Sequence, residues 1–289
     1  MWLQEHHIRF GRAGQLGESP TPRLALCDIA LVEPASGLQV AAGTAAIFLV
    51  LAGRAEVRSL EGRFELGARR WLVLDRDSAP TLRMGPGGIA VAITLNGAAL
   101  RNPAGLAAAA LMPGSGPLDR LTYRLVRQAL RAQDAPMTHF WMREPSLNAL
   151  IERLAACQRA LLPRADSCPG RSYLRKCQVL ARLQRARLYV EGHADRVVHI
   201  PELAALTNFS PWYFTKTFHR VYGDSPQSYA CRVRLDRARS LLAATPYSVS
   251  EIAEACGFEN QSSFARAFRR SFGRSAKEFR AAAPQFAHA

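Results

Sequence analysis

The stretch GFENQSSFARAFRRSFGRS, Gly257 to Ser275, places phenylalanines at helical spacing between arginines and serines. A similar segment lies fifty residues earlier, so that Phe214 aligns with Phe264 and Phe218 aligns with Phe268. Because residues four apart share one face of a helix, each phenylalanine pair is expected to face a core. The chain therefore carries a repeated helical unit whose remaining faces point outward.

Each copy has the signals of a helix, a tight turn and a second helix. In the second copy, Ser248 and Glu251 form a capping box that begins a helix, and Gly257 supplies the left-handed residue that ends it. In the first copy, Asn208 takes the place of that glycine, and Ser210 followed by proline begins the next helix. The pattern predicts two helix-turn-helix units.

The outward faces of the second helices carry small, amide-bearing, aromatic and cationic side chains. They are Trp212, Thr215, Lys216 and His219 in the first copy, and Gln261, Ser262, Ala265, Arg266 and Arg269 in the second. Arg and Gln can make bidentate contacts to base edges in the major groove. A solvated face would look similar in one copy, but the same layout in two copies favours a surface that reads DNA.

A long helix is predicted between the two units, from Pro226 to Ala243. Proline begins it, and Thr245-Pro246 ends it. Its eighteen positions span about 27 Å, which with the flanking turns approaches the roughly 34 Å between successive major-groove faces of B-DNA. One polypeptide can therefore place two reading helices on one side of a duplex.

Basic residues are concentrated in the same part of the chain. The 289 residues include 38 Lys+Arg and 23 Asp+Glu, a formal charge of +15. Residues 1–170 have 19 basic and 14 acidic residues (+5), and the remaining 119 have 19 and 9 (+10). This excess indicates a polyanionic partner, with a solvated basic face as the alternative.

The N-terminal part predicts strands followed by helices. From about Arg23 to Leu95, short apolar runs are broken by Gly and Pro about every ten residues, which is typical of a small β-barrel or sandwich. Residues 102–117 are expected to be irregular. Two helical stripes follow, Leu118, Leu121, Leu125 and Ala129 in the first, and Leu147, Leu150, Ile151, Leu154 and Leu161 in the second.

Two stretches carry a resemblance to a known family: IAEACGFENQSSFARAFRRSFGRSAKEFR, Ile252 to Arg280, and LAALTNFSPWYFTKTFHRVYGDSPQSY before it. They resemble the AraC/XylS family of bacterial transcription regulators, and the resemblance covers about residues 173 to 283. It implies two helix-turn-helix units joined by a long helix. Ala276 departs from the family, which usually has proline there, and predicts a less sharply defined start of the last helix.

The resemblance also implies roles for the residues of the two reading helices. The residues expected to contact bases are Trp212, Thr215, Lys216, Gln261, Ser262, Ala265 and Arg266. Those expected to contact phosphates are His219, Arg220, Arg269 and Arg270. Those expected to form the core are Phe214, Phe218, Phe264 and Phe268. Phosphate contacts fix the register of the protein on DNA without reading sequence. Trp212 is alternatively a partly packed aromatic, and Arg220 and Arg270 alternatively pair with acidic residues inside the protein.

The N-terminal part is similar in architecture to the cupin-like sensing and dimerisation domain that is common in this family. The helices of Leu118–Leu130 and Leu147–Leu162 are candidates for a homodimer interface, with packing on their own barrel as the alternative. Candidate contacts to an anionic small-molecule effector are Arg23, Arg54, Arg58 and Arg83, with surface solvation as the alternative.

The expected fold class is α+β, with a cupin-like β-barrel and following helices, then an all-α domain. The predicted divisions are a sensing barrel over residues 1–117, a helical dimerisation segment over 118–165, a linker over 166–172 and an AraC-type DNA-binding domain over 173–283. The linker assignment rests on two prolines and a glycine between Leu162 and Ser172.

The sequence predicts no catalytic residue, no metal site and no cofactor. No histidine lies between His7 and His139, which argues against a metal-binding cupin. The six cysteines include no CxxC pair, and Cys27 has no activating partner in its apolar run. The longest apolar run, Ala45 to Ala52, is far shorter than the roughly 18 residues of a membrane span, and the N-terminus lacks the pattern of a signal peptide. We therefore expect a cytoplasmic protein.

These observations predict a sequence-specific, DNA-binding transcription regulator that is controlled through its N-terminal domain and is not an enzyme. The family resemblance favours a homodimer that activates transcription through contact with RNA polymerase, and this step is analogy. The alternatives are a nonspecific architectural DNA-binding protein and an enzyme domain fused to a DNA-binding module.

Overall fold

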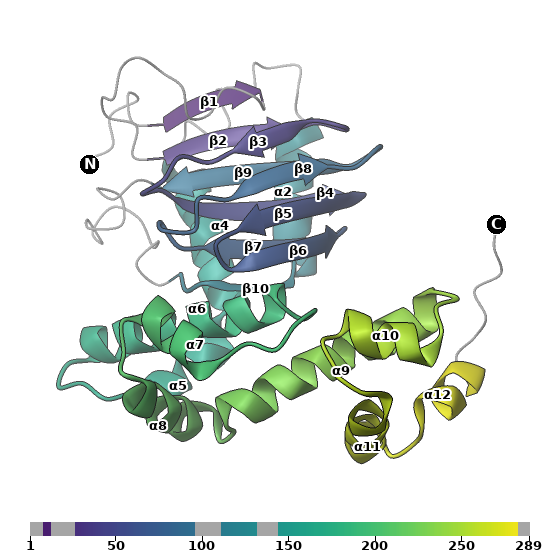
Figure 1. The fold of residues 1–289 in the computed structure, drawn as a ribbon. Helices are drawn as coiled ribbons and strands as arrows, with labels where there is room; N and C mark the ends of the chain where they lie inside the picture. The colour runs from purple at the N-terminus through teal and green to yellow at the C-terminus, as the bar shows by residue number, and fades with distance from the viewer. Residues whose placement is uncertain (1–7, 13–26, 96–110, 132–143, 283–289) are drawn as a thin grey trace. The chain divides into compact units, whose positions relative to one another are not determined.

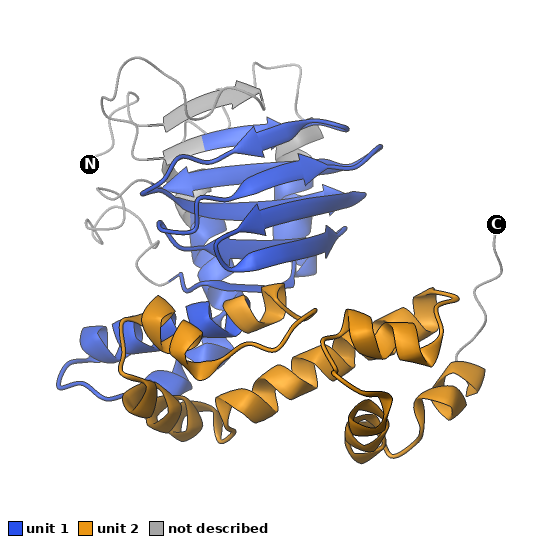
Figure 2. Ribbon diagram, viewed as in Figure 1, with its two compact units in different colours: residues 1–188 blue, residues 189–289 orange. Residues whose placement is uncertain are grey.

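The computed structural model describes residues 8–12, 27–95, 111–131 and 144–282. It divides into two compact units, unit 1 over Met1–Leu188 and unit 2 over Tyr189–Ala289 (Figures 1 and 2). Helix α6 (Tyr173–Gly192) begins directly after the predicted linker, and the division between the two units falls inside this helix.

Unit 1 contains two β-sheets. The strand order is β1-β2-β9-β4-β7-β10 in the first sheet and β3-β8-β5-β6 in the second. Neighbouring strands pair antiparallel except β1 and β2, which pair parallel. The strands are β1 Ile8–Arg12, β2 Cys27–Val32, β3 Gly37–Gln39, β4 Ala45–Ala52, β5 Arg54–Ser59, β6 Gly62–Gly67, β7 Arg70–Leu74, β8 Thr81–Met84, β9 Ile89–Leu95 and β10 Gly114–Pro117.

The central strand β4 has apolar side chains on both faces because both faces of the first sheet are covered. Phe48 and Val50 belong to the core between the two sheets. Ile47 and Leu49 point the other way, into a core shared with helices α2 (Arg120–Arg131) and α4 (Glu144–Cys157). The layers are therefore sheet, sheet and helices, with α2 and α4 behind the first sheet in Figure 1. The predicted order of strands followed by helices is confirmed.

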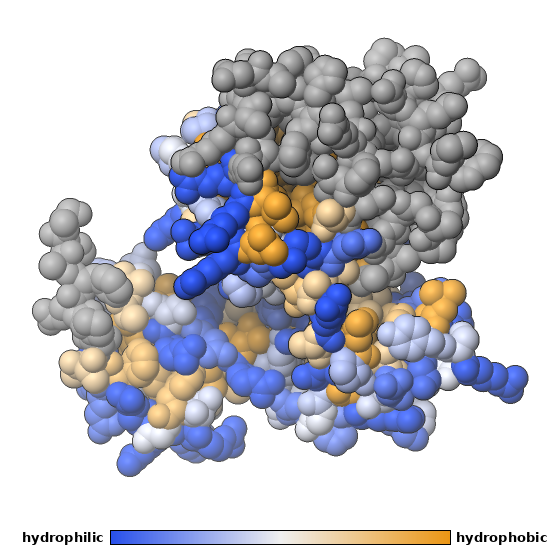
Figure 3. Space-filling model, turned by 180° about the vertical axis from the view of Figure 1, so that it is seen from behind, coloured by the Kyte–Doolittle hydropathy of each residue, from blue (hydrophilic) through white to orange (hydrophobic). Residues whose placement is uncertain are grey.

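The predicted apolar stripe of α2 is wrong in part. Leu121 and Leu125 are 48% and 40% exposed, whereas Thr122 and Val126 are buried. Asp119 caps the helix by accepting hydrogen bonds from the backbone N–H groups of Leu121 and Thr122. In the view from behind, with α2 and α4 nearer the reader than the sheets, a hydrophobic patch reaches the surface of unit 1 (Figure 3).

The second stripe, on α4, faces the core. Leu150, Ile151 and Leu154 are buried against the first sheet. Leu161 is half-buried in the short helix η3 (Arg159–Leu161), which is followed by α5 (Pro163–Asp166). The side chains of Ala129 and Leu147 lie outside the described part of the structure.

The segment expected to be irregular, residues 102–117, ends in a strand. β10 pairs with β7, and the indole N–H of Trp71 donates to the carbonyl of Pro117 at 3.0 Å. A Cβ on Gly116 would lie 2.8 Å from a carbon of the Trp71 ring, so only glycine lets the ring lie flat on this strand. A glycine-rich edge strand has no apolar alternation, and the sequence pattern therefore does not reveal it.

A buried ion pair attaches α6 to the second sheet within unit 1. Arg185 donates to the carboxylate of Glu61 at 2.7 Å, and the hydroxyls of Ser59 and Ser78 donate to the same carboxylate at 3.0 and 2.9 Å. Leu188, one turn further along α6, joins the core between the sheets. The charge of Glu61 is thus fully hydrogen-bonded where it is buried.

Unit 2 is helical over its described residues. Helix α9 forms its axis: α8 packs at the beginning of α9, and α10, α11 and α12 pack near its end (Figure 1). In the described part of the whole chain, none of the helices has the length and apolarity that a membrane crossing needs. The helices of unit 2 after α6 are α7 Ile200–Thr207, α8 Pro211–Tyr222, α9 Pro226–Ala244, α10 Val249–Ala255, α11 Gln261–Phe272 and α12 Ala276–Ala282.

Candidate nucleic-acid interface

Helices α8 and α11 begin and end in the same way. Ser210 and Asn260 are their N-caps, and each accepts a hydrogen bond from the backbone N–H three residues on, at 3.3 and 2.8 Å. Both helices end at glycines in the left-handed conformation, Gly223 with φ 71° and Gly273 with φ 73°. The two helices therefore begin and end at corresponding positions in the two copies of the repeat.

The turns before these helices are also equivalent. Asn208 and Gly257 both have positive φ, 53° and 71°, as their places in the two turns predict. The capping box of α10 is confirmed: the N–H of Ser248 donates to Glu251 at 2.7 Å, and the N–H of Glu251 donates to the Ser248 hydroxyl at 3.2 Å. Each copy is a helix, a tight turn and a second helix.

The start of α12 is more definite than expected from the missing proline. The N–H of Ser275 donates to the carboxylate of Glu278 at 2.7 Å, and the N–H of Glu278 donates to the Ser275 hydroxyl at 3.2 Å. This second capping box fixes the first turn at Ala276 without the proline ring.

The phenylalanines of both helices form equivalent cores. Phe214, Phe218, Phe264 and Phe268 are at most 1% exposed. The distances between ring centroids repeat closely, which means that the two copies fold in the same way around their central phenylalanine. They are 5.7 Å for Phe214–Phe218 and 5.5 Å for Phe264–Phe268, 4.6 Å for Phe218–Tyr222 and for Phe268–Phe272, and 5.9 Å for Phe218–Tyr229 and for Phe268–Phe279.

The outward face of α8 carries an aromatic and cationic pair. Trp212 is 68% exposed, and the ammonium of Lys216 lies 4.7 Å from the centroid of its ring. Thr215, between them on the same face, is half-buried and donates its hydroxyl hydrogen to the carbonyl of Pro211 at 2.9 Å. Trp212 is thus not a packed aromatic, and Thr215 presents its methyl group and an acceptor oxygen. His219 is exposed further along the helix.

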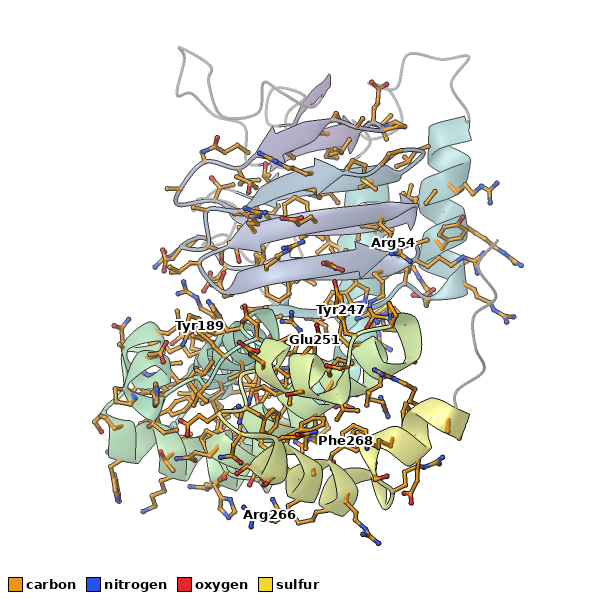
Figure 4. All side chains as sticks on the ribbon, turned by 45° about the vertical axis from the view of Figure 1, so that its right-hand side comes forward. Arg54, Tyr189, Tyr247, Glu251, Arg266 and Phe268 are labelled. Carbon is orange, nitrogen blue, oxygen red and sulfur yellow. The ribbon has the colours of Figure 1, made fainter. Side chains whose placement is uncertain are left out.

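The outward face of α11 is fully exposed. Arg266 points away from the body of unit 2, whereas Phe268 lies among the helices (Figure 4). The residues that the sequence placed on this face, Gln261, Ser262, Ala265, Arg266 and Arg269, are all exposed, and so is Arg270, the further predicted phosphate contact.

In the described part of the chain, the cations of both faces form no ion pair, although the pKa of the Glu278 carboxyl is lowered by its hydrogen bonds with Ser275 and further by the nearby Arg269. Three acidic groups of unit 2 pair with other arginines: Asp224 with Arg232 at 2.8 Å, Asp236 with Arg239 at 3.2 Å, and Glu202 with Arg196 at 2.7 Å. On the two reading helices, the cations without an ion pair among the described residues are Lys216, His219, Arg220, Arg266, Arg269 and Arg270. Their charge is therefore available to an external anion.

Glu202 anchors the first helix-turn-helix unit to the end of α6. It accepts from the guanidinium of Arg196 and, at 3.0 Å, from the hydroxyl of Tyr189, and it caps the N–H of His199 at 2.8 Å. The Arg196 hydrogen bond is the main cause that lowers the pKa of Glu202 to about 2, against the opposing effect of burial. This carboxylate is charged over the whole neutral range.

Helix α9 fixes the distance between α8 and α11. Tyr229 near its start donates to Glu191 at 2.6 Å, and Arg234 donates to the carbonyl of Gly257, in the second turn, at 2.7 Å. Gly257 in turn lies so close to Arg196 that a Cβ would come 2.7 Å from the Arg196 Cα. The 19 residues of α9 span about 28 Å, with α8 and α11 at opposite ends (Figure 1).

Comparison with known proteins also finds helix-turn-helix domains similar to the C-terminal part of the chain. A profile of helix-turn-helix domains matches residues 203–282. LumQ of Photobacterium leiognathi, a probable transcriptional regulator, is 37% identical over 87 residues, which are 30% of this chain and 35% of LumQ.

Two solved structures are also similar to this part of the chain. A probable AraC family transcriptional regulator of Rhodopseudomonas palustris has 38% identity over 35% of this chain and 96% of its own, with a TM-score of 0.34. The DNA-binding domain of AdpA, a global transcriptional factor solved in complex with a target DNA, has 30% identity over 35% of this chain and 91% of its own, with a TM-score of 0.34.

The C-terminal part of the chain is a helix-turn-helix domain, and it belongs to the AraC type. The likeness is confined to this part: the chain spans about a quarter to a third of the length of the curated relatives it matches.

Proposed function

We propose that the protein is a sequence-specific DNA-binding regulator of transcription that reads two successive major-groove segments, one with α8 and one with α11. The observation that carries this proposal is the pair of exposed, unpaired cationic faces at opposite ends of α9. Their separation, about 28 Å along α9 plus the flanking turns, approaches the roughly 34 Å of one turn of B-DNA. The basic excess of the second part of the chain supports a polyanionic partner.

The residues in the first half of each reading helix are proposed to contact bases, because the N-terminal part of a recognition helix enters the groove. Arg266 and Gln261 suit guanine and adenine, which accept bidentate contacts from these side chains. Thr215 uses its hydroxyl hydrogen internally, so its methyl group suits the methyl of thymine. The complete proposed set is Trp212, Thr215, Lys216, Gln261, Ser262, Ala265 and Arg266.

The cations in the last turn of each helix are proposed to contact phosphates. His219 and Arg220 occupy the last turn of α8, and Arg269 and Arg270 occupy the last turn of α11. These positions lie beyond the residues that enter the groove, where the sugar-phosphate backbone passes. They would contribute affinity and register equally on every sequence.

Unit 1 is proposed to be a cupin-like sensing and dimerisation domain that controls unit 2. The exposed Leu121 and Leu125 support α2 as the homodimer interface, since both have apolar side chains and neither is covered by its own sheets. A dimer would present four reading units to DNA. We propose that the protein acts as an activator through RNA polymerase, in keeping with its family resemblance.

An anionic small-molecule effector is proposed to bind at the outer face of the second sheet. Arg54 and Arg83 line a hollow of about 440 Å³ there, together with the carboxylates of Glu56 and Glu65; Arg54 is labelled in Figure 4. An anionic effector would compete with these carboxylates for the two arginines. Arg58 is instead bound to Glu56. Arg23, the fourth candidate, lies outside the described residues. Binding would act by favouring one arrangement of the units or subunits over another.

The proposal is tested by selecting bound sequences from a random duplex library with the purified full chain at two salt concentrations. A regulator of this kind enriches a site with two elements about one helical turn apart, at both salt concentrations. The variant Trp212→Ala should degrade one element, and Arg266→Ala should degrade the other.

The competing functions give different results in the same selection. An architectural protein binds through phosphates alone, enriches no motif and loses affinity steeply as salt rises. An enriched site with one element only would contradict reading by both helices. Either result would overturn the proposed function.

A further inference from the structure

A hollow of about 540 Å³ lies in unit 2 beside the start of α11. One wall is the beginning of α10, and the other is α12. The lining residues used below are Ser248, Ser250, Gln261, Lys277 and Arg280. Gln261 also belongs to the reading face of α11, so the hollow adjoins the surface proposed to contact bases.

Lys277 supplies an unneutralised charge to this hollow. Its side chain is exposed, and it has no ion pair among the described residues. The two acidic residues nearest in sequence to the walls, Glu251 and Glu278, direct their carboxylates to the backbone N–H groups of Ser248 and Ser275. They are therefore engaged in capping their own helices.

Arg280 connects the two walls of the hollow. Its guanidinium donates to the carbonyl of Tyr247, just before α10, at 2.5 Å, and the side chain is half-buried. This bond joins α12 to the start of α10, where Figure 4 labels Tyr247 and Glu251. Arg280 is thus a positioning residue, and Lys277 is the cation left to meet a ligand.

We propose that this hollow seats a phosphate of the DNA backbone, bound by Lys277 with the hydroxyl of Ser250 as a second donor. The inference rests on the proposed function. When Gln261 contacts a base edge, the flanking phosphates lie within the roughly 12 Å width of the major groove, and the hollow adjoins Gln261. Lysine and serine are among the side chains that donate to phosphate oxygens.

The first helix-turn-helix unit has no equivalent cations at these positions. By the fifty-residue repeat, Lys277 corresponds to Gln227 and Arg280 to Ala230, which is buried. The phosphate seat is therefore a property of the second unit. This phosphate contact would bind the second unit to the duplex more tightly than the first unit. The second unit would therefore contribute more to the salt dependence of DNA affinity.

The test measures the affinity of the full chain for its selected site, by fluorescence anisotropy, over a series of salt concentrations. Lys277→Ala should reduce the slope of log K against log salt by about 0.9, the value for one phosphate contact. It should lower affinity by the same factor on the selected site and on a scrambled duplex. Lys277→Arg should keep the slope, and the matched control Gln227→Ala in the first unit should leave it unchanged.

The outcomes separate this inference from the function on which it rests. If the wild-type chain prefers its site but Lys277→Ala keeps the full slope, the phosphate seat is wrong and the proposed function stands. If Lys277→Ala changes which bases are preferred, Lys277 contacts a base, and the seat is again wrong. A wild-type chain that prefers no sequence contradicts the proposed function itself. Equal melting curves for the variants would show that the fold is kept.

Discussion

Lys216 holds its ammonium over the ring of Trp212, 4.7 Å from the centroid, on the exposed face of α8. The two residues are four apart, so they lie one above the other on the helix. An exposed tryptophan contributes little to the fold, but here it orients a cation on the surface proposed to read DNA. The pair therefore acts as one element of that surface.

The pair can be tested by a double-mutant cycle on DNA binding. Trp212→Ala and Lys216→Ala should each weaken binding to the selected site, and the double variant should lose less than the sum, because each residue supports the contact of the other. The free energy of unfolding should change by less than about 0.5 kcal/mol, since Trp212 is exposed. Tyr173→Ala, an exposed aromatic at the start of α6, is the control and should bind normally. Strictly additive losses would mean that the two residues act separately.

Arg266 and Arg269 lie on one face of α11 but are proposed to play different roles. Arg266→Ala should weaken binding to the selected site by about 1–3 kcal/mol and relax the preference at one base position. Arg269→Ala should weaken binding to every duplex by a similar factor and reduce the salt slope by about 0.9. Affinities for the selected site and its single-base variants measure both effects. A uniform loss from Arg266→Ala would reassign that residue to the backbone.

Gly257 is required by both its conformation and its neighbours. Gly257→Ala should destabilise unit 2 by about 1–2 kcal/mol for the left-handed backbone and by a further 1–3 kcal/mol or so because the new Cβ meets Arg196. Gly273→Ala has the same backbone conformation but open space around the Cβ, so it should show only the first cost. Urea unfolding followed by far-UV circular dichroism compares them. Equal losses would show that the close approach to Arg196 does not matter.

Glu202 predicts an acid-sensitive anchor for α7. Its pKa is lowered from the ordinary 4.5 to about 2, chiefly by the hydrogen bond from Arg196, so its stabilisation is present above about pH 4.5 and is lost as pH falls towards 2. Glu202→Gln should therefore be less stable than the wild type at pH 7, and the difference should shrink through that window. Glu254→Gln, an exposed carboxylate on α10, is the control. A difference that is constant with pH would contradict the ion pair.

The helix-turn-helix units were predictable from sequence because their signals are local and occur twice. Asn208, Gly257 and the cap residues mark the turns, and the phenylalanine spacing marks the cores. The packed face of α2 was not predictable from leucine spacing, because Thr122, a polar residue that hydrogen-bonds to Asp119 and Arg153, takes a buried position while Leu121 and Leu125 are exposed. The sequence of β10 has no apolar alternation, and the strand packs against the ring of Trp71.

The reading faces were predictable in composition, but their chemistry depends on contacts. The internal hydrogen bond of Thr215 and the stacking of Lys216 on Trp212 follow from helix geometry that the sequence implies only indirectly. Lys277 was missed altogether, because its role depends on α12 lying beside the start of α10. The one available signal was the repeat itself, in which a lysine stands opposite Gln227.

The most direct test of the account is to move the two elements of the selected site apart by half a helical turn, about five base pairs, and measure affinity. Because α9 is a single helix anchored at both ends, α8 and α11 cannot both follow the displaced elements. Affinity should fall to that of a duplex with one element alone. Unchanged affinity for the displaced site would contradict simultaneous reading by the two helices of one chain.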